Sequence, residues 1–388
     1  SGQFDVQSLV VEDGFFNIIL HEDGTNNIQN ALATNSTKSE TKESSPVEVH
    51  LKKIELRNLD IHKLNEATHV DIETYIYNAV GGFKTEEKAI KAHIDSEFEL
   101  NVINGSDTTY VKRKQFELHT DISIDNETGI IDIAPSGIVM EHGDFELVGS
   151  VATKNEVDLD LSIKGTKPNF DMLIAFAPHD LVPVLERYNN AGQIYFNAII
   201  DGPVTNGAQP YIKAEFGADQ AFLENTEVAK KVDDLGFKGF FTNGEQRNLE
   251  TMEFSLTEMQ ANLEQGRFLG DVRVKNFKEP EIDMQLDADF NLDFLTKFLN
   301  LNDVEGVTGS VELHMKFNDI IDLDNPQKAI EELNRAYFAE LKVTDLSLSS
   351  SKLESPLDQL NAHLIMKGKK AELDQFEAVM GQSDLSIT

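Results

Sequence analysis

The amino-acid sequence predicts a mainly β protein: an elongated, curved antiparallel sheet that forms a β-groove and carries a few short helices. Three observations support this fold class: long segments in which apolar and polar residues alternate, turn dipeptides such as Asn-Gly and Gly-Gly between them, and a scarcity of helical spacing. The clearest segment is 90–102, where almost every second residue is apolar. Because successive side chains of a strand point to opposite faces, this segment would have one apolar and one polar face.

The same alternation recurs in later segments, which extends the predicted sheet along the chain. Residues 116–124, 157–163, 282–292 and 311–317 each place apolar side chains on one face and polar side chains on the other. A sheet with one apolar and one solvated face is typical of antiparallel pairing. At about 3.3 Å per residue, residues 90–102 would extend over about 40 Å, far longer than an average strand.

Helical spacing is confined to short segments. Residues 169–188 are expected to contain one or two short helices interrupted by prolines, and residues 291–301 place leucine and phenylalanine side chains at helical intervals. Residues 325–338 open with an asparagine cap and a proline at the first helical position. Residues 225–235 are a fourth helical candidate.

By composition the chain divides into three segments. Residues 1–32 are predicted to form a β-hairpin around Asp23-Gly24, followed by an apolar stub. Residues 33–46 contain no large apolar side chain and are predicted to form a flexible polar loop, and residues 47–388 are the groove domain. The sequence ends in a strand-like segment, and we expect the chain to be a piece of a longer protein.

Two blocks of the groove domain, at about residues 145–200 and 266–317, resemble each other. In each block a glycine opens a strand, an alternating strand follows, an Asn-x-Asp-x-Leu segment opens a short helix, and a second glycine opens another strand. The similarity predicts that the sheet is built from repeated strand–strand–helix–strand units.

The bulk composition disfavours several classes of function. The chain has 34 basic and 68 acidic residues, a net charge of −34, which repels nucleic acid and anionic membrane surfaces. It has no cysteine, so disulfides and thiolate metal sites are excluded. Its ten histidines show no metal-ligand or catalytic spacing. We therefore expect a protein that is not an enzyme and that uses no cofactor and no metal.

The segment at residues 9–32 carries a more specific pattern. An alternating strand is followed by Asp-Gly-x-x-Asn, a short apolar stub and the polar loop, and the chain closes on "GQSDLSIT". This arrangement resembles the AsmA-like family of bacterial envelope proteins, which is related to the TamB-type bridge-like lipid-transfer proteins. Ile28 stands where many relatives have a tryptophan.

The resemblance implies a place in the cell envelope and a ligand. Such a protein would lie in the periplasm, anchored to the inner membrane by an N-terminal helix that this sequence does not include. Its curved sheet would hold phospholipid acyl chains on an apolar lining and assist lipid transport or outer-membrane biogenesis. Envelope proteins would be its partners, and nucleic acid would not.

The apolar face of the predicted sheet supplies the candidate lining residues. They would either pack against a second layer as a closed core or line a groove that stays open to acyl chains, whose burial is favourable by about 0.8 kcal/mol per methylene. The candidates are Ile94, Phe98, Leu100, Phe116, Leu118, Ile122, Leu159, Leu161, Met284, Leu286, Leu313 and Met315.

Two other functions remain open at this stage. The first is a structural or adhesive β-rich envelope protein that binds no lipid. The second is an enzyme acting on envelope polysaccharide, which would need a cleft with two carboxylates about 5–10 Å apart.

Overall fold

The computed structural model describes most of the chain. Strands make up 74% of the described residues, which also include three short helices, so the predicted mainly β class is confirmed. The predicted loop at residues 33–46 lies outside the described residues. The described residues are 3–23, 25–27, 48–86, 88–104, 108–154, 157–167, 169–177, 182–204, 208–301, 304–320, 337–350, 352–353, 355–368 and 370–387.

The described residues divide into two compact units, each considered by itself below. Unit 1 comprises Ser1–Gly165, Asp171–Val182 and Ile199–Pro210. Unit 2 comprises Thr166–Phe170, Pro183–Ala198 and Tyr211–Thr388.

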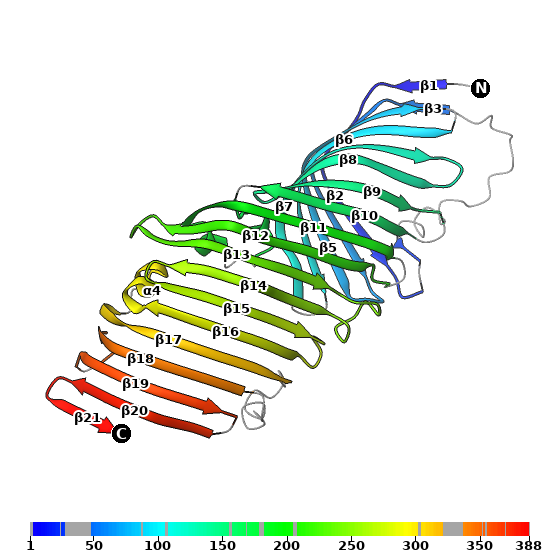
Figure 1. Cartoon of the computed structure of the whole chain (residues 1–388). Coiled ribbons are helices and arrows are strands. Elements are labelled where there is room, and N and C mark those ends of the chain that lie inside the picture. The colour runs from blue at the N-terminus through cyan, green and yellow to red at the C-terminus, as the bar shows by residue number, and fades with distance from the viewer. Residues whose placement is uncertain are drawn as a thin grey trace. The chain divides into compact units, whose positions relative to one another are not determined.

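Unit 1 is a sheet in which the strands after β4 pair antiparallel in chain order (Figure 1). Two short segments, β1 and β3, form a separate parallel pair. The strands are β1 (Gln3–Val6), β2 (Leu9–Leu20), β3 (Glu48–Leu51), β4 (Lys53–Asn65), β5 (Val70–Thr85), β6 (Ala89–Asn104), β7 (Thr108–Asp125), β8 (Ile130–Met140), β9 (Gly143–Ala152) and β10 (Asp158–Lys167).

The predicted N-terminal hairpin stays a prediction. After β2 the chain turns tightly, with the His21 N–H donating to the Thr25 carbonyl at 2.8 Å and Leu20 forming an antiparallel bridge with Asn26, while β2 itself pairs in parallel with β4. The Asn27 side chain also bonds to β2: its Oδ1 accepts from the Ile19 N–H at 2.9 Å, and its Nδ2 donates to the Asn17 carbonyl at 2.8 Å. One amide therefore satisfies backbone groups of β2 that a returning strand would bond. The apolar stub lies outside the described residues.

Unit 2 is also an antiparallel sheet in chain order (Figure 1). Strand β11 (Tyr188–Pro203) contributes its first part to unit 2 and its last part to unit 1. The other strands are β12 (Tyr211–Asn225), β13 (Lys230–Thr242), β14 (Glu253–Leu263), β15 (Gly266–Lys275), β16 (Glu281–Asn291), β17 (Glu305–Ile320), β18 (Tyr337–Ser349), β19 (Leu357–Lys367), β20 (Lys370–Met380) and β21 (Ser383–Ile387).

Irregular residues bend both sheets. In unit 1, Asp13 and Asn58 have positive φ angles of 55° and 51°, and the pairing of β5 with β6 skips Tyr77 in the same region. In unit 2, register shifts accompany Asp234 and Glu258, whose φ angles are 50° and 52°. A bulged residue interrupts the ladder and increases the local twist and bend of its strand. Bulges on neighbouring strands therefore produce curvature.

The helices are short, as predicted. They are α2 (Asp171–Ile174), α3 (Val182–Leu185) and α4 (Leu292–Phe298). Asn291 caps α4, its side chain accepting from the N–H groups of Asp293 and Phe294.

The helical candidate at residues 225–235 is wrong. This segment is the end of β12, a turn and the start of β13. Leu223 pairs there with Val232, so the alternating side chains of a hairpin bury the apolar residues. The candidate at 325–338 falls largely outside the described residues.

The proposed repeat stays a prediction. The first block contains β9, β10, two four-residue helices and β11, whereas the second contains β15, β16, the seven-residue α4 and β17. The order of elements is similar, but the helical parts differ in number and length.

Candidate functional site

The apolar side chains of unit 1 share one face of the sheet, here called the unit 1 apolar face. A central cross-strand row comprises Leu59, Ile76, Phe98, Phe116 and Met140, each paired with the next on the neighbouring strand. The Phe98 and Phe116 rings stack with centroids 5.3 Å apart. Since directly opposed side chains are the closest neighbours in a sheet, this row forms a continuous apolar band across five strands.

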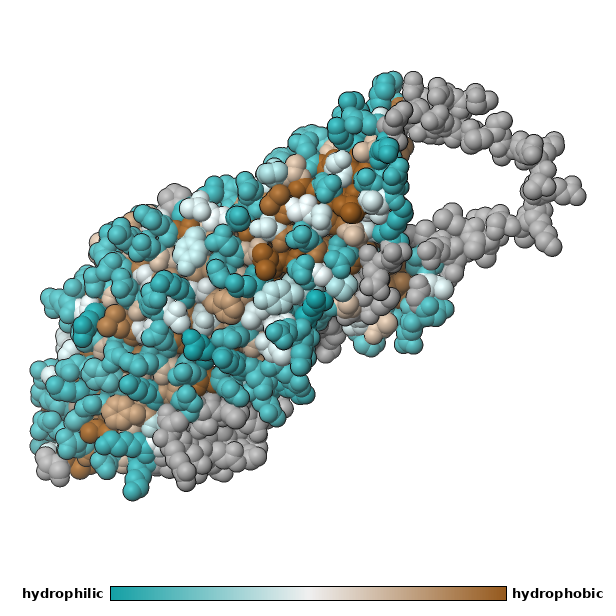
Figure 2. All heavy atoms as spheres, turned by 45° about the vertical axis from the view of Figure 1, so that its right-hand side comes forward, coloured by the Kyte–Doolittle hydropathy of each residue, from teal (hydrophilic) through white to brown (hydrophobic). Residues whose placement is uncertain are grey.

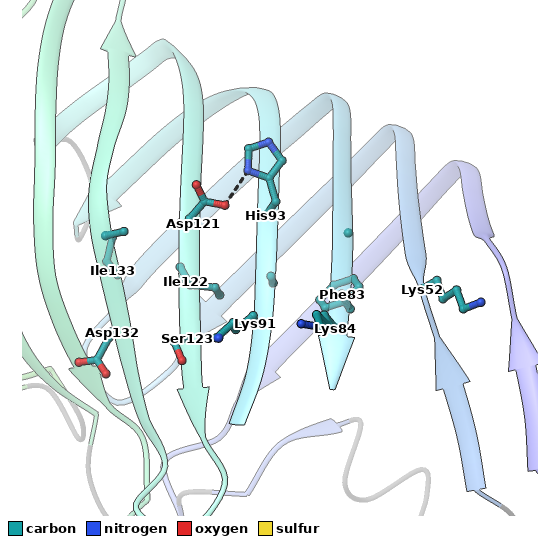
Figure 3. A pocket seen from close by; sticks show the side chains of 13 residues that line it. Lys52, Phe83, Lys84, Lys91, His93, Asp121, Ile122, Ser123, Asp132 and Ile133 are labelled. Atoms are coloured by element: carbon teal, nitrogen blue, oxygen red, sulfur yellow. Dashed lines mark hydrogen bonds and ion pairs between the residues drawn. The ribbon is translucent and has the colours of Figure 1, made fainter. Parts of the chain in front are cut away.

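A second row on the same face borders an open hollow. Phe83 pairs with Ala92, Ala92 with Ile122, and Ile122 with Ile133. These four residues, together with alternating polar residues of β5 to β8, line a hollow of about 750 Å³ (Figure 3). Figure 3 also shows the strands turning through a sharp bend beside it. The bend makes this part of the sheet a trough.

The eight predicted lining residues of unit 1 lie on this face. Pairings such as Ala92 with Ile122 and Phe98 with Phe116, continued by alternation along each strand, place them on the same side. All are half-buried: Ile94, Phe98, Leu100, Phe116, Leu118, Ile122, Leu159 and Leu161. Figure 2 shows hydrophobic side chains gathered between hydrophilic ones on the visible surface.

Helix α2 covers one end of the unit 1 apolar face. Met172 is fully buried; a Cβ on Gly165 would collide with its side chain and a Cβ on Gly143 would be in tight contact with its backbone, so two glycines let α2 approach the sheet. Lys114, only 7% exposed, reaches from β7 and donates to the Ala177 carbonyl at 3.0 Å. This bond ties the chain after α2 to the sheet.

The unit 2 apolar face is built in the same way. Leu286 pairs with Met315 and Met315 with Ala339, while Met284 pairs with Phe317 on the adjacent row. The four predicted lining residues of this unit are on this face and half-buried: Met284, Leu286, Leu313 and Met315.

Helix α4 fills part of the unit 2 apolar face. Phe294 is 1% exposed and packs with Phe298 against Val232 and Ala261 of the sheet. The Phe298 carbonyl accepts hydrogen bonds from the Tyr188 hydroxyl at 3.0 Å and from Asn225 Nδ2 at 2.9 Å. This part of the face is therefore a closed core.

The opposite face of unit 1 is polar and carries cross-strand charge pairs. His93 Nδ1 lies 2.9 Å from Asp121 Oδ1, and His119 Nδ1 lies 2.8 Å from Asp95 Oδ1. The hydrogen bond to Asp121, and then the charge of Asp95, raise the pKa of His93. The hydrogen bond from His119 is the main cause that lowers the pKa of Asp95.

Sequence reasoning missed one group on this polar face. Asp71 and Glu73 lie nine and eleven positions after His62 in the sequence, and the pairing of β4 with β5 brings the three residues together. The sequence does contain a signal for this group. Two alternating segments joined by a short turn predict a hairpin, and that hairpin places His62 and Glu73 opposite each other.

Comparisons with protein families, curated proteins and solved structures gave no match. Among the described residues no helix combines the length and apolar character needed to cross a membrane.

Proposed function

We propose that the protein is a non-enzymatic lipid-handling protein that holds acyl chains on its apolar faces. The observation that carries the proposal is the row of half-buried side chains beside the open hollow of unit 1, in particular Phe83, Ile122 and Ile133. Within the part of the chain that the structure describes, helices α2 and α4 cover parts of the apolar faces.

The energetics favour such a ligand. Each methylene moved from water onto an apolar face contributes about 0.8 kcal/mol, and a half-buried side chain loses its remaining exposure at the same time. Charged side chains such as Lys84, Lys91 and Asp132 lie beside the hollow, so a polar head group would remain in a polar, hydrated region.

We further propose that the protein belongs with the AsmA-like family and acts in the periplasm, anchored to the inner membrane in its full-length form. The support is the resemblance of residues 9–32 to that family. Fractionation of bacterial cells that produce the full-length protein tests this location: recovery in the cytosolic fraction would contradict it.

Native mass spectrometry of protein purified from an envelope-containing lysate tests the lipid proposal. We expect phospholipid to remain bound to the wild type and to be reduced in the Leu100→Asp and Leu286→Asp variants, because a carboxylate on the apolar face opposes acyl-chain contact. Gln285→Asp is the matched control, since Gln285 is exposed on the opposite face of β16.

Two outcomes would contradict the proposal. If the wild type carries no lipid and captures none from phospholipid vesicles, a structural or adhesive protein is the better description. If circular dichroism shows that both apolar-face variants are unfolded while Gln285→Asp is folded, Leu100 and Leu286 belong to a closed core.

A further inference from the structure

A second cluster lies on the polar face of unit 1. His62, Asp71 and Glu73 each offer one ligand atom, and these atoms all lie within 4.8 Å of one another. His62 on β4 is paired directly with Glu73 on β5, and Asp71 is two residues from Glu73 on the same face. Because the groups stand on adjacent hydrogen-bonded strands, the backbone holds their positions.

The Asp71 carboxylate is poorly satisfied. Its neighbours in register are the apolar residues Leu64 and Ile103, and its Oδ1 is inaccessible to solvent and has no hydrogen-bond donor. His62 Nε2 lies 2.5 Å from this oxygen and forms an ion pair with it when the imidazole is protonated. With a neutral imidazole the buried oxygen has no cation or donor beside it, which is costly, and a bound metal ion would remove that cost.

Asn101 fixes the second carboxylate of the cluster, that of Glu73. It is paired with Glu73 across β5 and β6, and its Nδ2 donates to Glu73 Oε2 at 2.8 Å. A hydrogen bond of this kind orients a ligating carboxylate, as partners behind metal ligands commonly do.

The cluster is accessible. A hollow of about 460 Å³ is lined by His62, Glu73 and Asn101 together with Asp60 and Glu99 of the same face. Water can therefore reach His62 and Glu73 and complete a coordination sphere. The net charge of −34 also raises the local concentration of cations.

We propose that His62, Asp71 and Glu73 bind one divalent cation of the zinc type, with water in the fourth position. One imidazole and two carboxylates form a donor set that zinc accepts in proteins, whereas calcium requires oxygen ligands. Around a tetrahedral ion two ligand atoms lie about 3.3 Å apart. Here the His62 and Asp71 atoms lie 2.5 Å apart and all three ligand atoms lie within 4.8 Å of one another, so the side chains have to shift by up to about 1.5 Å to bind one ion.

Titration of ZnCl₂ into chelator-treated protein, followed by isothermal calorimetry, tests the proposal. We expect one zinc ion per chain and an affinity at least tenfold lower in both His62→Ala and Glu73→Gln. His314→Ala is the control, because the exposed pair of His314 with Asp287 lacks a third ligand and should leave the affinity unchanged. Thermal melting in EDTA establishes that each variant is folded.

A second measurement separates zinc from general cation binding. Zinc should raise the melting temperature of the wild type and of His314→Ala but not of His62→Ala, and a tenfold excess of calcium should not displace it. The proposal is overturned if the wild type binds no zinc at 0.1 mM, if the His62 and Glu73 variants bind as tightly as the wild type, or if calcium displaces zinc.

Discussion

At the residue scale, polar side chains at irregular backbone positions shape the sheets. Leu56 and Leu59 are three residues apart, yet their pairings with Ala79 and Ile76 put both on the apolar face, because Asn58 between them is bulged. In the sequence, the apolar positions of this strand change from even to odd residue numbers between Leu56 and Leu59. This change marks a bulge because an extra residue shifts every later side chain to the other face.

Gly149 has the most demanding backbone of the glycines that open the two similar blocks. Its φ is +149°, and a Cβ would collide with the Asp160 carbonyl of β10. We expect Gly149→Ala to destabilise the protein by about 1–3 kcal/mol, whereas Gly137→Ala, where a Cβ meets nothing, should be nearly neutral. Urea unfolding measures both. Equal stability of the two variants would show that Gly149 is not required.

At the element scale, the charge pairs between β6 and β7 make stability depend on pH. The pKa of His93 is raised above its ordinary 6.5, so its contribution is complete below that value and is lost as the pH rises through the raised pKa. The pKa of Asp95 is lowered below 3.8, so its contribution is present above 3.8 and is lost as the pH falls through the lowered pKa. The contributions of His93 and Asp95 are therefore both present between about pH 4 and pH 6.5.

His93→Gln should therefore lower the melting temperature more at pH 5.5 than at pH 8.5. At the higher pH a smaller fraction of the wild-type histidine is protonated, so the difference between the two proteins becomes smaller. Melting curves of both proteins at the two pH values make the comparison. A decrease of the same size at both would mean that the charge on His93 contributes nothing.

Helix α4 stabilises unit 2 by burying Phe294. Replacement of a fully buried phenylalanine by alanine costs about 3–5 kcal/mol, and we expect this loss for Phe294→Ala. Leu299 at the end of the helix is 46% exposed, so Leu299→Ala should cost less than about 1 kcal/mol. Chemical denaturation of both variants tests the difference, and a small effect at Phe294 would show that the sheet does not depend on α4.

Local patterns predicted these elements to different extents. The alternation at residues 90–102 and the spacing of Leu292, Leu295 and Phe298 identified β6 and α4, because each pattern is decided by near neighbours. The parallel partner of β2 is β4, separated from it by a long segment, and no local pattern encodes that choice. At residues 225–235, lysines and valines suit a short helix as well as a hairpin, so tertiary pairing decided the outcome.

At the scale of the whole molecule, the predicted lining residues share a single face within each unit, and their role as a lining stays a prediction. Their alternation fixes that face, but the exposure of each side chain depends on what covers it. Met172 of α2 and Phe294 of α4 cover parts of these faces, and neither helix could be placed on its sheet from the sequence. Whether a groove stays open therefore depends on which elements pack against the sheet, and the alternation of apolar and polar residues does not predict that packing.

The excess of 34 negative charges sets the response of the protein to salt. Salt weakens surface ion pairs, each worth no more than about 1 kcal/mol, but it also screens repulsion among the unpaired acidic groups. Glu97 and Glu117 show the second effect locally, because they are exposed and directly opposed on β6 and β7. With acidic residues in twofold excess, repulsion outweighs attraction.

We therefore expect the melting temperature to rise between 10 mM and 300 mM NaCl, measured with EDTA present so that bound metal does not contribute. Glu117→Lys turns one opposed repulsion into an attraction and should raise the melting temperature at 10 mM more than at 300 mM, because screening removes the difference. A wild-type melting temperature that falls with salt would mean that the ion pairs dominate. A Glu117→Lys effect independent of salt would mean that its cause is not electrostatic.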